Sequence, residues 1–169
     1  SNKEELKGKY VETSRQNFLS TLDISTYSFT RISKSASKIM SNGGSLLTLT
    51  YVGSNKTTPN YNVMGVAKAA LETSVKYLSV DLGKNNIRVN AISAGPMKTI
   101  AGAAISGARH VYRYSEKIAP LQKNPDLEDV GKAALYLLSD ISSGVTGLTH
   151  YVDGGLKIVG IPHQNMVNI

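Results

Sequence analysis

Residues 45–52 read SLLTLTYV and residues 87–92 read IRVNAI, and these two short runs decide the fold. Each has the length and the apolar, strand-favouring composition of a strand buried on both faces of a parallel sheet. The stretch between them, residues 60–82, carries apolar side chains at helical intervals and ends at Gly83, a residue type that commonly terminates helices. We therefore predict two parallel strands joined by a helix in a right-handed crossover.

A long helix is expected upstream of this unit. Its inward face is predicted from side chains at alternating four- and three-residue steps, which are Phe18, Leu22, Ser25, Phe29, Ile32, Ala36 and Ile39. Asn42-Gly43-Gly44 follows, and glycine readily takes the left-handed conformation that ends helices.

Further elements are expected downstream. Ala94-Gly95-Pro96 breaks the second strand, helices are predicted at 109–118 and 126–138, and residues 146–152 form a last strand. The alternation of helices and strands predicts an α/β protein with a Rossmann-like, doubly wound parallel sheet. Three strands are few for such a sheet. We therefore expect residues 1–169 to be the C-terminal part of one larger domain.

The composition of the 169 residues excludes several classes of function. The absence of cysteine excludes a disulfide framework, a thiolate metal site and a cysteine nucleophile. No stretch approaches the ~20 apolar residues of a membrane span, so we expect no membrane partner. A net charge of +7 admits an anionic partner, with a mildly basic solvated surface as the alternative. Because no dense basic run or interleaved stacking aromatic is present, we expect no nucleic-acid partner.

The 60–82 helix carries a charge on its apolar stripe. The stripe consists of Tyr61, Met64, Lys68, Leu71, Val75, Leu78 and Leu82. Seven residues are nearly two helical turns, so Tyr61 and Lys68 project from one face roughly 10 Å apart. An ammonium beside a phenol stabilises the phenolate and lowers its pKa, so the two residues are a candidate acid pair. The alternative is that Lys68 only reaches from the edge of the stripe into solvent.

Two further segments are predicted at the carboxyl ends of the strands, where doubly wound sheets bind their ligands. Tyr51 ends the first strand, and the alternative for it is an ordinary tyrosine with its hydroxyl in water. Residues 93–99 read SAGPMKT and follow the second strand. Their small residues permit close approach to a ligand, Thr99 is suited to bonding a phosphate, and Lys98 adds positive potential.

Five segments together carry a resemblance to a known family. These are TYVG at 50–53, PNYNVMGVAKAALE at 59–72, IRVNAISAGP at 87–96, DVG at 129–131 and YVDGG at 151–155. The chain resembles the bacterial-type enoyl-acyl carrier protein reductases, which are divergent short-chain dehydrogenases/reductases. Ordinary members of that larger family have tyrosine and lysine four residues apart, whereas this chain has Gly65 at that position and Lys68 seven residues after Tyr61.

The resemblance implies an enzyme of type II fatty acid synthesis. It would reduce the trans-2 double bond of enoyl thioesters by hydride transfer from NADH, with NADPH also possible. The implied catalytic residues are Tyr51, Tyr61 and Lys68: Tyr61 would bond the thioester carbonyl, Lys68 would hold the nicotinamide ribose, and Tyr51 would line the substrate pocket.

The resemblance also implies residues that contact the two ligands. The cofactor-binding residues would be Lys68, Met97, Lys98, Thr99, Ile100 and Ala101. The substrate pocket would be formed by Tyr51, Tyr61, Met64, Ala101, Ala104 and Ile105, and residues 100–107 would form a loop that closes over it.

The implied partner is the enoyl thioester of acyl carrier protein. Lys98, Arg109 and Arg113 are placed to attract that acidic protein, with solvated charges as the alternative. His110, His150 and His163 lack metal-ligand spacing, so no metal is expected. A cytoplasmic homotetramer is expected.

The family's Gly-rich dinucleotide turn does not precede the first helix. We therefore expect the N-terminal dinucleotide-binding part to be absent from this chain. The alternatives are a non-catalytic oligomerising fragment of such a reductase and another short-chain dehydrogenase/reductase.

Overall fold

The structure is a computed structural model that describes residues 3–103 and 106–166. Its main elements, in chain order, are α1 (Lys3–Leu6), α2 (Arg15–Leu22), a π-helical turn (Asp23–Tyr27), α3 (Ser28–Ser37), β1 (Gly44–Thr50), the 3-10 turn η3 (Val52–Ser54), α4 (Asn62–Gly83), β2 (Ile87–Ala94), α5 (Ile100–Ala103), α6 (Ala108–Ile118), α7 (Leu127–Leu138) and β3 (Thr149–Val152).

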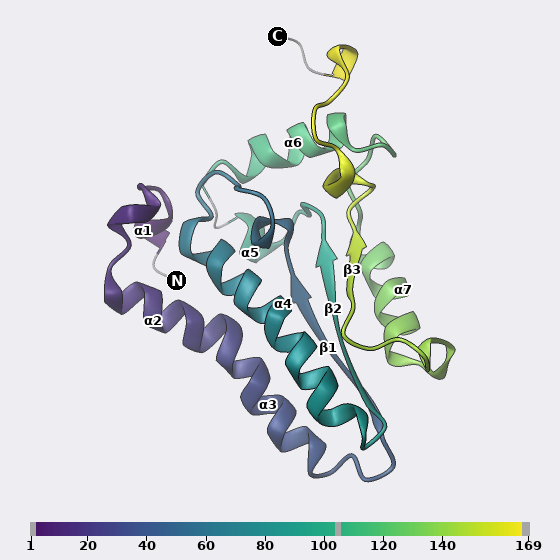
Figure 1. Ribbon diagram of the computed structural model, residues 1–169. Helices are drawn as coiled ribbons and strands as arrows, with labels where there is room; N and C mark the ends of the chain where they lie inside the picture. The colour runs from purple at the N-terminus through teal and green to yellow at the C-terminus, as the bar shows by residue number, and fades with distance from the viewer. Residues whose placement is uncertain (1–2, 104–105, 167–169) are drawn as a thin grey trace.

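The three described strands form one parallel sheet in the order β1-β2-β3. Gly44 pairs with Ile87, and the register continues to Thr50 opposite Ser93, which in turn lies opposite Tyr151. The predicted strand–helix–strand unit is confirmed, and so is the predicted parallel sheet. All three carboxyl ends consequently lie at one edge, and α6 crosses above that edge (Figure 1).

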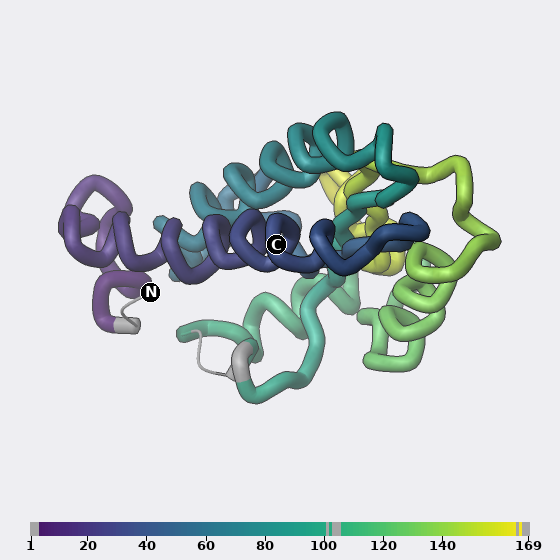
Figure 2. Tube along the Cα trace, turned by 90° about the horizontal axis from the view of Figure 1, so that it is seen from below, coloured from purple at the N-terminus to yellow at the C-terminus, as the bar shows by residue number. Residues whose placement is uncertain are grey.

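Helices cover both faces of the sheet, as the doubly wound arrangement requires. On one face, Val75 of α4 packs on Val89 and Ala91 of β2, with Phe29 of α3 against them. On the other face, α7 packs Val130 and Leu137 on the opposite side of β2. Figure 2 shows α2 and α3 running as one rod alongside α4. The core is therefore two apolar layers with the sheet between them.

The first helix differs from its predicted pattern. The π-helical turn at Asp23–Tyr27 inserts one extra residue, which rotates every later side chain by about 100° around the axis. Ser33 is consequently buried, while Ile32 and Ile39 are 61% and 84% exposed. The prediction that Ile32 and Ile39 face inward was wrong: the inserted residue turns Ile32 outward, and α3 ends at Ser37, before Ile39.

Element boundaries differ in smaller ways. β1 ends at Thr50 and β3 begins at Thr149, so both are shorter than predicted, and α4 begins at Asn62 with Tyr61 as its N-cap. The predicted helix start at Asp126 is confirmed. The Asp126 carboxylate accepts from the Asp129 amide at 2.8 Å, and the Asp129 carboxylate accepts from the Asp126 amide in return.

Within the described part of the chain, none of the helices has the length and apolar composition needed to cross a bilayer.

Candidate active site

Two tyrosines meet at the carboxyl edge of the sheet. Tyr51 follows the last residue of β1, and Tyr61 caps the N-terminus of α4 with only 6% of its surface exposed. Their rings pack edge to face, with centroids 5.1 Å apart and planes at 65°. The predicted proximity of Tyr51 to the Tyr61 turn is therefore confirmed.

Two glycines make the space for the Tyr61 ring. A Cβ atom on Gly53 would lie 2.6 Å from Cδ1 of Tyr61, and a Cβ on Gly65 would lie 2.7 Å from the carbonyl oxygen of Gly53. Real side chains do not tolerate such separations. Gly65 therefore lets η3 approach α4 directly, and the position where ordinary relatives would carry lysine has no room for a side chain.

The backbone on both sides of Tyr61 has left-handed φ angles, although neither residue is glycine. Asn60 and Asn62 both have positive φ angles, 57° and 36°. Asparagine tolerates this region better than other residues with side chains. Asn62 donates to the Gly8 carbonyl oxygen at 2.8 Å, and Asn60 donates to that of Ser106, also at 2.8 Å. Sequence reasoning missed both asparagines, although their place on either side of Tyr61 was the available signal.

Burial dominates the electrostatics of both phenols. It raises the pKa of Tyr61 well above the ordinary 10.0, and the adjacent Tyr51 raises it further. Burial also raises the pKa of Tyr51, opposed by a hydrogen bond with Thr58. The expectation that Lys68 lowers the pKa of Tyr61 was wrong for this chain, because desolvation of the phenolate outweighs any attraction from the ammonium.

Lys68 lies beside the buried stripe of α4, which consists of Val63, Ala67, Leu71 and Val75. Its Nζ donates to the Leu49 carbonyl oxygen at 2.9 Å, near the end of β1. Burial lowers the pKa of Lys68, and the charge of Glu72 partly opposes that shift. The ammonium is thus held at the strand ends rather than extended into solvent.

Met64 lies on α4 one turn before Lys68 and is half-buried. Its sulfur accepts a hydrogen bond from the Ser25 hydroxyl at 3.8 Å. The predicted substrate residue Met64 is thereby placed between the Tyr61 turn and the first helical layer.

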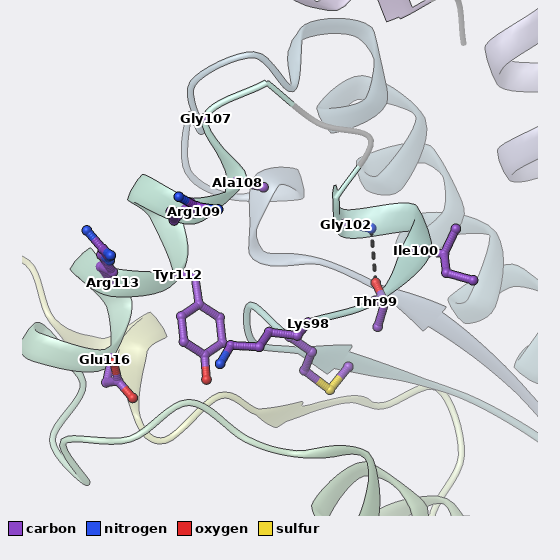
Figure 3. A pocket seen from close by; sticks show the side chains of 11 residues that line it. Lys98, Thr99, Ile100, Gly102, Gly107, Ala108, Arg109, Tyr112, Arg113 and Glu116 are labelled. Carbon is purple, nitrogen blue, oxygen red and sulfur yellow. Dashed lines mark hydrogen bonds between the residues drawn. The ribbon is translucent and has the colours of Figure 1, made fainter.

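The loop after β2 borders a separate cavity of about 960 Å³ (Figure 3). Four of the predicted cofactor residues line it, namely Met97, Lys98, Thr99 and Ile100, and α6 forms the opposite wall. The Thr99 hydroxyl oxygen accepts from the Gly102 amide at 2.9 Å, so its own proton remains available to a ligand.

Basic side chains gather on this cavity. Arg109 and Arg113 lie one turn apart on α6, and Lys98 Nζ lies 5.1 Å from the centroid of the Tyr112 ring (Figure 3). Glu116 is the acidic residue on the same wall. The predicted grouping of Lys98, Arg109 and Arg113 is therefore confirmed, and Tyr112 is a lining residue that sequence reasoning missed.

The remaining predicted residues are placed less fully. Ala101 lies within α5. Ala104 and Ile105 lie outside the described residues.

The fold is that of a Rossmann-like α/β protein with a candidate site at the carboxyl edge of its sheet, and comparison with known proteins identifies the family. The profile of the enoyl-(acyl carrier protein) reductase family matches residues 1–157. The NADH-dependent enoyl-[acyl-carrier-protein] reductase 1 of Rhizobium meliloti is 58% identical over 161 residues, covering 95% of this chain and 59% of that protein. The NADPH-dependent enzyme of Staphylococcus aureus is 51% identical and is covered to 62%, over 94% of this chain.

Comparison with solved structures identifies the same family. The crystal structure of the Anaplasma phagocytophilum reductase in complex with NAD superposes with a TM-score of 0.93 at 56% identity, covering 96% of this chain and 62% of that one. The chain therefore belongs to the enoyl-(acyl carrier protein) reductase family. It spans about 60% of the length of the relatives it matches.

Proposed function

We propose that the full-length protein reduces the trans-2 double bond of enoyl-acyl carrier protein thioesters in fatty acid elongation. The chain is the C-terminal part of its reductase domain. The observation that carries this proposal is the corner where Tyr51 and the buried Tyr61 stack at the carboxyl edge of the sheet, with Lys68 seven residues after Tyr61. Family membership and the relatives' activities support it.

Tyr61 acts as a hydrogen-bond donor to the thioester carbonyl. The ordinary pKa of a phenol, 10.0, already keeps its proton at neutral pH, and burial raises the pKa of Tyr61 further. A neutral donor aimed at an oxygen that gains negative charge stabilises the enolate, and this is the chemistry of an oxyanion hole. Tyr51 and Met64 supply the apolar wall for the substrate.

The residues around the large cavity fit an anionic dinucleotide. Lys98 adds positive charge beside Thr99, and the Thr99 hydroxyl retains a proton for a phosphate oxygen. NADH or NADPH supplies a hydride to the β-carbon of the substrate when bound. Lys68 would hold the ribose hydroxyls, Met97 the carboxamide through its backbone, and Lys98, Thr99, Ile100 and Ala101 the pyrophosphate side.

The assembly belongs to the same proposal. We place the protein in the cytoplasm as a homotetramer, with acyl carrier protein approaching the basic residues of α6. The chain spans about 60% of the length of its relatives, so the assembly belongs to the full-length protein.

The proposal is tested by oxidation of NADH or NADPH with a crotonyl thioester and the full-length protein. Tyr61→Phe is expected to lower kcat about 100-fold, the usual cost of removing one oxyanion donor. Tyr136→Phe, at an exposed position of α7, is the matched control and keeps full activity. A wild-type protein with no rate on either nucleotide would contradict the proposed function.

Lys68→Ala tests the cofactor role separately. It is expected to weaken NADH or NADPH binding about tenfold or more, the effect of losing a hydrogen bond to a charged group. Titration of the nucleotide by fluorescence measures this, with exposed Lys76→Ala as the control. An unchanged dissociation constant would mean that Lys68 does not hold the ribose.

A further inference from the structure

The Glu72 carboxylate accepts three hydrogen bonds from the segment that surrounds Tyr51 in the chain. Glu72 lies on α4, one turn beyond Lys68, and its carboxylate accepts from the Thr50 hydroxyl at 2.7 Å, the Ser54 hydroxyl at 2.5 Å and the Asn55 amide at 3.3 Å. Thr50 ends β1 and Ser54 ends η3. One carboxylate therefore fastens the end of the strand and the following turn to the helix.

The same group of contacts extends across the sheet. The Asn55 amide also donates to the Tyr151 hydroxyl at 3.3 Å, and Tyr151 belongs to β3. Thr50 and Tyr151 lie in one row of the sheet, on either side of Ser93. Glu72 is thus the acceptor at the centre of a polar network that joins α4, β1, η3 and β3.

Each part of the proposed site is attached to the segment that Glu72 holds. Tyr51 lies in the chain between Thr50 and Ser54, whose hydroxyls donate to Glu72. Lys68 donates to the carbonyl oxygen of Leu49, the residue before Thr50. The ring of Tyr61 rests on Gly53, the residue before Ser54. A movement of this corner would therefore displace all three side chains together.

Given the proposed function, we infer that Glu72 is a positioning residue: it holds the Thr50–Asn55 corner against α4 so that Tyr51, Tyr61 and Lys68 share one geometry. Hydrogen bonds to a carboxylate are stronger than those between neutral groups, so a single carboxylate can hold this corner in place. The Glu72 carboxylate also faces the ammonium one turn away on α4. Among the described residues, that ammonium, which belongs to Lys68, and Tyr151, reached through Asn55, are the titratable groups linked to the Glu72 carboxylate.

The test uses three variants of the full-length protein. Glu72→Ala removes the acceptor, Glu72→Gln keeps one acceptor oxygen of similar reach without the charge, and Asp81→Asn removes an exposed carboxylate from the same helix as the matched control. Amide hydrogen exchange over residues 50–56 reports whether the corner is held. The kcat and KM for a crotonyl thioester report whether the geometry is used.

Glu72→Ala is expected to speed exchange in the corner about tenfold and to lower kcat at least tenfold, the scale of losing hydrogen bonds to a charged acceptor. KM is expected to change by less than about threefold, since the binding surfaces remain. Glu72→Gln should recover most of the lost kcat and of the protection. Asp81→Asn should match the wild type in every measurement.

Two results would overturn the inference. One is wild-type exchange and kcat in Glu72→Ala; the other is a loss of kcat in Glu72→Ala that Glu72→Gln does not relieve. If Glu72→Ala does not fold, Ser54→Ala removes a single donor, and unchanged exchange and kcat in that variant also overturn it. A wild-type protein without reductase activity contradicts the proposed function instead, and the exchange measurement then decides the role of Glu72 by itself.

Discussion

The protonation state of Tyr61 is set by its burial rather than by a charged neighbour. Its ring lies between Tyr51 and Gly53 and is largely removed from water, which disfavours the charged phenolate. A group that keeps its proton is suited to donating a hydrogen bond, and it is unsuited to releasing that proton at neutral pH. Under the proposed function, the tyrosine would therefore stabilise charge on its ligand, while Lys68 is held at the Leu49 carbonyl.

This view of Tyr61 predicts the outcome of an alkaline titration. Subtracting the tyrosinate absorbance of Tyr61→Phe from that of the wild-type full-length protein should give an ionisation step above the ordinary pKa of 10.0. Because the folded pKa is the higher one, this group's contribution to stability is fully present below pH 10.0 and is lost as the pH rises through the folded pKa. The same subtraction with Tyr77→Phe checks that one tyrosine is removed cleanly. A step below 10.0 would show that a cation, and not burial, governs Tyr61.

Contact between two elements, η3 and α4, depends on Gly65. Gly65 lies in the first turn of α4, and within a helix alanine is more favourable than glycine by up to about 1 kcal/mol. The Gly53 carbonyl oxygen, however, occupies the space that any side chain at position 65 would need. Steric exclusion at one contact therefore outweighs helix propensity.

Gly65→Ala is accordingly expected to destabilise the protein by about 1–3 kcal/mol, because the backbone of η3 has to move. Gly131→Ala is the matched control: Gly131 lies inside α7, and a Cβ there meets no atom within 4 Å. That variant is expected to gain up to about 1 kcal/mol from helix propensity. Urea unfolding of the full-length variants measures both, and equal effects of the two substitutions would contradict the contact argument.

Apolar side chains are exposed on the side of the molecule formed by α3 and α4. Ile39 at the end of the first helical rod is 84% exposed, and Tyr77 and Val80 of α4 are 72% and 79% exposed. Tyr77 and Val80 are three residues apart and share one face of α4. Clustered apolar surface of this kind is typical of faces that contact other protein. It supports the proposed tetramer, in which this face of α4 meets a neighbouring subunit.

Val80→Glu should therefore lower the mass of the full-length protein in light scattering from that of a tetramer to that of a dimer or monomer. A charge placed in an apolar interface is not compensated there. Val11→Glu, at a position that is 84% exposed and lies near the N-terminal end of α4, is the control and should keep the wild-type mass. A tetramer that withstands Val80→Glu would place the interface elsewhere.

The sequence by itself determined the order of the elements and their parallel pairing. Apolar runs such as IRVNAI and the capping acidic residues at 126–129 act locally, so they can be interpreted without knowing their neighbours. The positions of Tyr51, Tyr61 and Lys68 at one edge also followed, because parallel strands share the edge at which they end. Their family pattern reinforced this prediction.

Only the tertiary structure decided the rest, because the rest depends on contacts between segments far apart in the chain. The inserted residue at Asp23–Tyr27 turned Ile32 outward, burial reversed the expected pKa shift of Tyr61, and Glu72 acquired its donors from β1 and η3. Desolvation and packing arise from what surrounds a side chain in space. The sequence states which residues are present, but it does not state which of them lie close together in the folded chain.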